Sequence, residues 1–279
     1  MAWLRKPIRG ILMDITGVLY ESGERKAIEG SIDALRMLRT ADIPFRFITN
    51  ETQKTKEQLD SVLHRLGFDI YEREMFMCVP AAKKFIHDLN YRPFLLVHPN
   101  VEAEFAECNQ NEPNCVVVGD AASNFSYENM NRAFHVLVDN DDSVLITLGK
   151  GKYYKEDGKM TMDVGPFTAA LEASALQRPY ATDRHAIVIG KPGEEFFRLA
   201  LEDMKLRPED VVMIGDDLVC DVGGAQSAGM RGVLVRTGKF RPEDENHPTI
   251  KPDAIVKNLL EAIERVLSTE RPAKEVRPE

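Results

Sequence analysis

The chain has 279 residues, of which 43% are hydrophobic, and its 36 basic and 45 acidic residues give a formal net charge of −9 at pH 7. This length suits one large domain or two of ordinary size, and the negative charge argues against a nucleic-acid or anionic-membrane partner. No apolar stretch approaches the about 20 residues that span a bilayer, and the four cysteines have no CxxC spacing. We therefore expect a cytoplasmic protein with free thiols, which can also occur in the nucleus.

The first predicted strand ends in polar residues. This strand, Ile11-Leu12-Met13, leads directly into Asp14, Thr16 and Gly17. An apolar strand followed by an acidic residue places a carboxylate at the carboxyl end of a sheet, which is the edge where open α/β proteins bind ligands. Asp14 is therefore the first candidate functional residue.

Helices and strands alternate up to about residue 76. Apolar residues at helical spacing predict a helix over 32–38, and a short apolar run predicts a strand over 45–48. Thr55 is a typical N-cap of the next helix, and Gly67 is typical of the position just after its end. This alternation predicts a parallel sheet with right-handed crossovers.

A second series of elements lies between residues 77 and 184. The sequence predicts helices over 80–89, 127–138 and 166–175 and strands over 94–97, 115–118 and 144–147. About 100 residues suffice for an independent hydrophobic core. We therefore predict a discontinuous core domain of residues 1–76 and 185–267, an inserted α/β domain of residues 77–184, and a disordered tail of residues 268–279.

The first alternation returns after Arg184. The sequence predicts strands over 186–189, 211–214 and 233–235, a helix over 194–204 and a final amphipathic helix that ends near Leu267. The strand over 211–214 runs into Gly215, Asp216 and Asp217, with Asp221 soon after. Carboxylates from the ends of two strands can meet over one sheet, where they can bind Mg²⁺ and supply a nucleophile that attacks phosphorus.

Four motifs in this order carry a resemblance. They contain Asp14 with Thr16, then Thr49-Asn50, then Lys191-Pro192, and finally Asp216 with Asp221. In these motifs the chain resembles the haloacid dehalogenase superfamily of phosphohydrolases, in the branch with an inserted α/β cap. The resemblance extends from Ile8 to Leu267 and implies a Rossmann-like, doubly wound parallel sheet as the core, the inserted domain as the cap, and Mg²⁺ as the cofactor.

The resemblance also implies a role for each residue. Asp14 is expected to be the nucleophile that forms an aspartyl-phosphate, and Lys191 to offset charge on the transferring phosphoryl group. Asp14, Asp216 and the main-chain carbonyl of Thr16 are expected to bind Mg²⁺, while Asp217 and Asp221 orient metal-bound water. The resemblance further implies that the substrate is bound by Asp14, Ile15, Thr16, Thr49, Asn50 and Lys191.

Thr16 departs from the family pattern. Most phosphatases of this superfamily have a second Asp two positions after the nucleophile, which acts as general acid and base. Threonine cannot protonate an alkoxide leaving group at neutral pH, and general acid catalysis typically contributes about 10²–10⁴-fold. Phosphoanhydrides and protonated phosphoramidates need an acid less, so Thr16 favours these substrates over alcohol phosphomonoesters. Glu51 and Asp217 are candidates for the base of the second half-reaction.

A closer resemblance supports the same substrates. It rests on residues 14–20, 125–131, 148–155 and 235–242, and it implies hydrolysis of inorganic pyrophosphate and of phosphorus–nitrogen compounds such as phospholysine, phosphohistidine and imidodiphosphate-like molecules. The partner is then a small phosphorylated substrate or a protein that carries phosphohistidine or phospholysine, and we expect a homodimer. Two alternatives stay open, a small-molecule phosphomonoester phosphatase and a weakly catalytic regulatory protein with the same fold.

A basic and aromatic segment follows the predicted strand over 144–147. It contains Lys150, Lys152, Tyr153, Tyr154 and Lys155. We predict a loop here, which either senses the leaving group or is a solvated loop without a role in the site.

Overall fold

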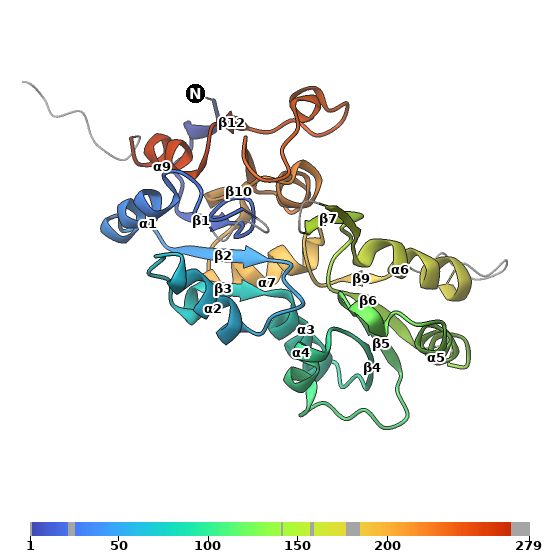
Figure 1. Ribbon diagram of the computed structural model, residues 1–279. Helices are drawn as coiled ribbons and strands as arrows, with labels where there is room; N and C mark the ends of the chain where they lie inside the picture. Colours follow the sequence, from blue (N-terminus) through green and yellow to red (C-terminus); the bar gives the residue numbers. More distant parts are fainter. Residues whose placement is uncertain (1, 22–25, 141, 157–158, 177–184, 269–279) are drawn as a thin grey trace, which may run out of the picture. The chain divides into compact units, whose positions relative to one another are not determined.

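The structure is a computed structural model that describes all residues except 1, 22–25, 141, 157–158, 177–184 and 269–279 (Figure 1). The chain forms two compact units. The first contains Met1–Phe47, His64–Asp69 and Leu201–Glu279, and the second contains Ile48–Leu63 and Ile70–Ala200. These boundaries differ from those predicted for core and cap, which stay a prediction. The predicted disordered tail, 268–279, lies outside the described residues except for Ser268, which ends a helix.

A six-stranded sheet has the strand order β12-β11-β10-β1-β2-β3. β1 pairs in parallel with β2 on one side and with β10 on the other (Figure 1). The strand order therefore reverses between β1 and β10, which creates the topological switch point of a doubly wound sheet. The predicted α/β fold is confirmed. The six strands are β1 (Gly10–Met13), β2 (Phe45–Thr49), β3 (Met75–Met77), β10 (Val211–Gly215), β11 (Arg231–Val235) and β12 (Ala254–Val256).

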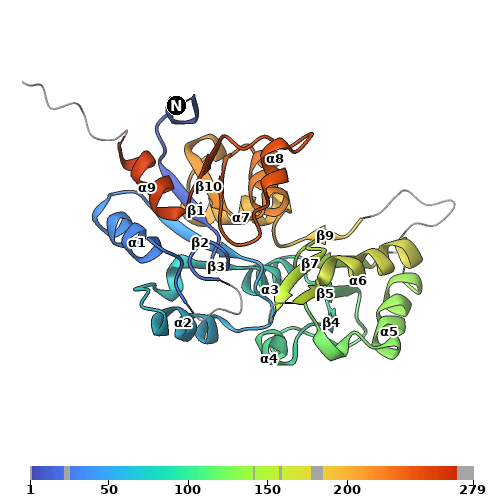
Figure 2. The same cartoon turned by 45° about the horizontal axis from the view of Figure 1, so that its top comes forward.

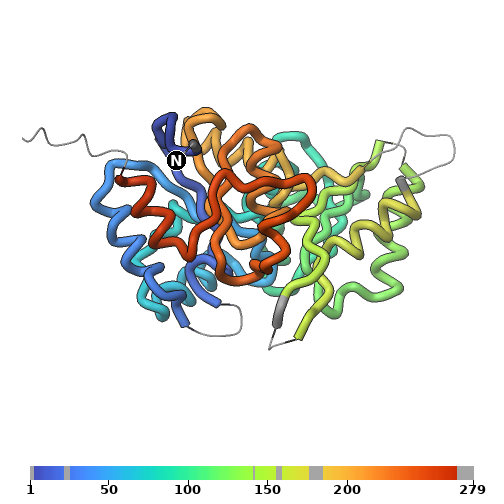
Figure 3. Tube along the Cα trace, turned by 90° about the horizontal axis from the view of Figure 1, so that it is seen from above, coloured from blue at the N-terminus to red at the C-terminus, as the bar shows by residue number. Residues whose placement is uncertain are grey.

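Helices α1 (Ser31–Thr40) and α9 (Leu259–Ser268) come from opposite ends of the chain and lie side by side in the first unit (Figures 2 and 3). Apolar residues recur every three or four positions in both helices, which gives each one a continuous apolar stripe. The buried residues of these stripes are Ala34, Leu35 and Leu38 in α1 and Leu259, Ala262, Ile263 and Val266 in α9. The contact between the two helices joins segments that are far apart in the sequence into one unit.

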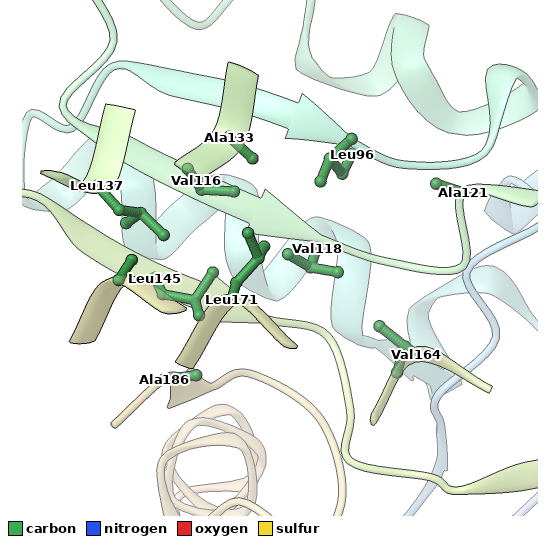
Figure 4. Close-up of a cluster of buried hydrophobic side chains, with 11 residues drawn as sticks. Leu96, Val116, Val118, Ala121, Ala133, Leu137, Leu145, Val164, Leu171 and Ala186 are labelled. Carbon is green, nitrogen blue, oxygen red and sulfur yellow. The ribbon is translucent and has the colours of Figure 1, made fainter. Parts of the chain in front are cut away.

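The second unit contains a parallel sheet of order β4-β5-β6-β9. Helices α5 and α6 pack on this sheet, and Figure 4 shows buried Val116, Val118 and Leu145 of the strands facing Leu137 of α5 and Leu171 of α6. Because these residues are aliphatic and almost fully buried, the unit has a hydrophobic core of its own. The elements are β4 (Pro93–Leu96), β5 (Cys115–Val118), β6 (Val144–Thr147), β9 (Ile187–Val188), α5 (Tyr127–Val138) and α6 (Val164–Leu171).

The strand predicted over 186–189 belongs to a different sheet from the one we expected. We placed it in the second part of the core, whereas the structure pairs β9 in parallel with β6 in the four-stranded sheet. An apolar run such as Ala-Ile-Val-Ile identifies a buried strand but does not tell which of two parallel sheets it joins.

The predicted loop over Lys150–Lys155 is also corrected. An antiparallel hairpin is formed by β7 (Tyr153–Glu156) and β8 (Lys159–Met162), so the loop ends at Lys152. The residues of β8 are mostly exposed, and both four-residue strands contain polar residues, so neither forms the apolar run by which we identified the buried strands.

Two of the remaining helices match their predictions closely, α7, which spans the predicted 194–204, and α2. Thr55 and Gln58 exchange side-chain and main-chain hydrogen bonds at the start of α2, and Gly67 has φ of +91° beyond its end. Each helix in the described part of the chain is too short or too polar to cross a membrane. The helices are α2 (Lys56–Arg65), α3 (Cys78–Asp88), α4 (Pro99–Glu102), α7 (Glu194–Met204) and α8 (Gly224–Ser227), with short 3₁₀ or π turns between them.

Candidate active site

The parallel pairing of β1 with β10 brings the two predicted strand-end motifs together. Met13 lies opposite Ile214, and the main-chain N–H of Asp14 donates to the carbonyl of Ile214 at 3.0 Å. Asp14 and Asp216 therefore follow neighbouring strands at the same edge of the sheet, as their sequence pattern predicted.

Three carboxylates form a buried cluster at this edge. Asp14, Asp216 and Asp221 each offer an oxygen, and these atoms all lie within 4.8 Å of one another. The side chains are only 8%, 2% and 0% exposed. Gly215 makes room for the cluster, because a Cβ at this position would lie 2.1 Å from Oδ2 of Asp221. Asp221, expected only to orient water, thus belongs to the carboxylate cluster itself.

Such a cluster is electrostatically unfavourable without a cation. Burial raises the pKa of Asp216 well above its ordinary value, and the neighbouring Asp14 and Asp221 raise it further. Oδ1 of Asp216 is buried and has no hydrogen-bond partner among the described residues. Buried anionic oxygens that converge within 4.8 Å suit a hard divalent cation, whose charge would offset their repulsion. The residues present therefore fit the expected metal.

Asp217 has a structural task in this group. Its Oδ1 accepts hydrogen bonds from the main-chain N–H groups of Val219 and Cys220, at 3.0 and 2.9 Å, and so caps the turn that follows. Its own N–H donates to Oδ2 of Asp221 at 3.0 Å. Asp217 therefore fixes the turn that carries Asp221 into the cluster. Its predicted role in orienting metal-bound water stays a prediction.

A loop that our sequence reasoning did not include in the site holds Asp216 in place. The main-chain N–H of Lys239 donates to Oδ2 of Asp216 at 2.7 Å, and the Thr237 hydroxyl donates to the carbonyl of Gly17 at 2.5 Å. Nζ of Lys239 lies 3.3 Å from Oδ2 of Asp217. The available signal was the position of Thr-Gly-Lys after the apolar strand β11, the same pattern that identified Asp14.

Two neighbouring carboxylates stabilise the positive charge of Lys239. Burial lowers the pKa of its ammonium, but the nearby Asp217 and Asp216 carboxylates raise the pKa by more, so that it lies above its ordinary value. Lys239 is therefore a cation at any physiological pH.

Replacement of Gly238 by alanine should weaken divalent-cation binding. Gly238 has φ of +59°, and a Cβ there would lie 2.0 Å from Oδ2 of Asp216 and 2.6 Å from Cα of Gly17. Because neither contact can be tolerated, the loop must shift and Asp216 must turn. We expect at least tenfold weaker Mg²⁺ binding in isothermal titration calorimetry, the scale seen when groups that orient a ligand are lost.

Gly229→Ala is the matched control for this substitution. Gly229 also has a positive φ, +84°, but a Cβ there meets only Pro208 at 3.4 Å. This control should lose about 1–2 kcal/mol of stability through backbone strain and keep its Mg²⁺ affinity. Equal Mg²⁺ affinities of the two variants would show that the loop does not position Asp216.

Two predicted residues form a second group, in the second unit. Oδ1 of Asn50 accepts from the main-chain N–H of Lys191 at 2.7 Å, and Nδ2 of Asn50 donates to the carbonyl of Lys191 at 2.8 Å. Both polar atoms of the Asn50 amide thus contact Lys191, and the expected contact of this amide with phosphate stays a prediction. The Lys191 side chain is 3% exposed, so that Asn50 fixes the main chain of a buried lysine.

The remaining predicted site residues are Thr49, Thr16 and Ile15. Thr49 is buried, and its hydroxyl accepts from the main-chain N–H of Glu51 at 3.2 Å. The Thr16 hydroxyl donates to the Tyr20 hydroxyl at 3.4 Å, and buried Ile15 precedes it in the loop. Coordination of a metal by the Thr16 carbonyl and phosphate binding by Ile15, Thr16 and Thr49 stay predictions.

The basic and aromatic segment contacts the loop that follows β2. Nε2 of Gln53 donates both to the Tyr154 hydroxyl, at 3.1 Å, and to Oδ2 of Asp120, at 2.7 Å. Lys150 forms an ion pair with Glu172 at 3.4 Å. Tyr154 is thus hydrogen-bonded to a residue close in sequence to Thr49 and Asn50, in the same unit.

A doubly wound sheet with a buried carboxylate cluster at its switch point is an arrangement that suits an α/β hydrolase. The family model described as haloacid dehalogenase-like hydrolase matches residues 11–111, and a second model of hydrolases of this kind matches residues 188–262. The chain belongs to the haloacid dehalogenase-like hydrolase family.

Curated relatives support this membership over nearly the whole chain. The phospholysine phosphohistidine inorganic pyrophosphate phosphatase of Homo sapiens is 49% identical over 93% of this chain and 94% of its own length. The haloacid dehalogenase-like hydrolase domain-containing protein 2 of Bos taurus is 39% identical over 94% of this chain and 97% of its own length.

Solved structures share the fold at lower sequence identity. A 4-nitrophenylphosphatase from Thermotoga maritima has a TM-score of 0.80 and 24% identity, covering 93% of this chain and 97% of its own. NagD from E. coli K-12 has a TM-score of 0.78 and 20% identity, covering 92% and 98%. At these identities the likeness supports the α/β fold alone.

Proposed function

We propose that this protein is a Mg²⁺-dependent phosphatase that hydrolyses inorganic pyrophosphate and phosphorus–nitrogen compounds through an aspartyl-phosphate on Asp14. The observation that carries the proposal is Thr16, which stands two positions after Asp14 where an acid–base carboxylate is expected. Without that acid, substrates whose leaving groups depart unaided are favoured. The names of relatives up to 49% identical include the same substrates.

In the proposed mechanism, Asp14 is the nucleophile. A carboxylate oxygen of Asp14 attacks phosphorus, the bond to the leaving group breaks, and the electron pair departs with the leaving oxygen or nitrogen. Asp14 and Asp216 would hold Mg²⁺, which would supply Lewis-acid polarisation of the phosphoryl group. Lys191, whose main chain Asn50 holds, offsets charge on the transferring group. Water then hydrolyses the aspartyl-phosphate and frees Asp14.

A substrate panel tests the proposal. We expect kcat/KM for pyrophosphate and for phosphoimidazole, a phosphohistidine analogue, to exceed that for glycerol phosphate by about 10²-fold, the low end of a missing general acid. 4-Nitrophenyl phosphate is an uninformative monoester, because nitrophenolate leaves without a proton. If glycerol phosphate is hydrolysed as well as pyrophosphate, the protein is instead an ordinary monoester phosphatase.

We propose a small phosphorylated molecule or a protein with phosphohistidine or phospholysine as substrate, because the 49% identical human relative carries those substrates in its name. A homodimer and a cytoplasmic or nuclear location stay predictions.

A further inference from the structure

Lys239 is a cation beside the carboxylate cluster that the mechanism above does not use. Its main-chain N–H is fixed on Oδ2 of Asp216 at 2.7 Å, and its Nζ lies 3.3 Å from Oδ2 of Asp217. The Lys239 side chain is 46% exposed, and that of Asp217 is 22% exposed. The main chain is therefore anchored, while nearly half of the side-chain surface is open to solvent, from which an anion can approach.

The partner of this ammonium can be exchanged. Oδ1 of Asp217 already accepts two main-chain hydrogen bonds, from Val219 and Cys220, so that this carboxylate keeps partners when the lysine leaves. The ion pair itself is partly exposed, and such pairs contribute little to stability. A more highly charged anion such as a phosphate would compete well for the ammonium.

We propose that Lys239 binds the departing phosphate of pyrophosphate and is thereby a specificity-determining residue for anionic leaving groups. The proposal rests on the function proposed above. As the bond from Asp14 to phosphorus forms, the bridging P–O bond breaks and its electron pair stays on the departing phosphate. Since Thr16 provides no proton for that oxygen, a fixed cation stabilises the developing charge. A leaving imidazole or amine develops no negative charge when protonated beforehand, and therefore gains nothing from Lys239.

The positive charge of Lys239 should also weaken Mg²⁺ binding at the carboxylate cluster. An ammonium next to Asp217 and Asp216 repels a divalent cation at the cluster, so its removal should tighten Mg²⁺ binding about two- to fivefold, the effect of one partly exposed charge. A residue that only supported the loop would show the opposite sign, because a disturbed loop weakens the hold on Asp216.

The test compares Lys239→Met and Lys239→Arg with the control Lys257→Met. Lys257 pairs with Glu29 at 3.6 Å, is 71% exposed, and belongs to the same unit. We expect Lys239→Met to lower kcat/KM for pyrophosphate at least tenfold relative to that for phosphoimidazole, while calorimetry shows tighter Mg²⁺ binding. Lys239→Arg should keep most of the pyrophosphate activity, and Lys257→Met should change neither quantity.

Equal losses on the two substrates, or weaker Mg²⁺ binding by Lys239→Met, would overturn the inference. The proposed function fails separately, if the unsubstituted protein does not hydrolyse pyrophosphate. An active protein whose Lys239→Met variant keeps the ratio between the two substrates overturns the role of Lys239 alone.

Discussion

Replacement of Asp14 by asparagine should lower kcat for every substrate by about 10⁴-fold or more, the scale of losing a nucleophile. The amide is a poor nucleophile, and no other carboxylate of the buried cluster follows β1 directly. The measurement is steady-state turnover of pyrophosphate and phosphoimidazole at saturating Mg²⁺. Asp216→Asn should act differently, through weaker Mg²⁺ binding, because it removes charge from a carboxylate of the cluster.

Stability separates this effect from misfolding. Asp14 is one of the neighbours that raise the pKa of Asp216, so its neutral replacement relieves repulsion in the metal-free protein. We expect the unfolding temperature without metal to be unchanged or higher. The control Asp33→Asn changes an exposed carboxylate on α1, whose pair with Arg36 is also exposed, and should keep full activity. Near-normal turnover by Asp14→Asn would rule out the aspartyl-phosphate mechanism.

The pairing of Asp14 with Asp216 could be predicted from the sequence because it depends on local pattern and a general rule. Each residue follows an apolar strand, and the carboxyl ends of parallel strands meet at one edge. The position of Asp221 within the cluster could not be predicted in the same way. It depends on the turn that Asp217 caps and on the absence of a side chain at Gly215.

Contacts between distant segments lay beyond the sequence pattern. The hydrogen bond from Lys239 to Asp216 and those between Asn50 and Lys191 connect residues far apart in the chain, and no periodicity encodes them. The pairing of β9 with β6 also joins distant segments, and no periodicity encodes it. β12 went unpredicted for a different reason, since it has only three residues at the sheet edge and two of them are half-buried.

Replacement of Thr16 by aspartate should shift specificity towards alcohol phosphomonoesters. The new carboxyl group can protonate an alkoxide, so kcat/KM for glycerol phosphate should rise relative to that for pyrophosphate by up to about 10²-fold, the low end of general acid catalysis. The Thr16 hydroxyl contacts the Tyr20 hydroxyl at 3.4 Å, and this contact changes when aspartate replaces threonine. The added negative charge near Asp14 and Asp216 opposes this gain, because it increases the repulsion among the carboxylates of the cluster.

The ratio between substrate classes is the quantity to measure, since a general loss from altered folding or metal binding cancels in it. Thr16→Asn is the matched control, because it has the size of aspartate and hydrogen-bonding groups but no acidic proton. We expect its ratio to equal that of the unsubstituted protein. If the ratio of Thr16→Asp is also unchanged in a folded variant that binds Mg²⁺, the missing acid does not set specificity. The preference for anhydride and phosphorus–nitrogen substrates would then rest on similarity to relatives alone.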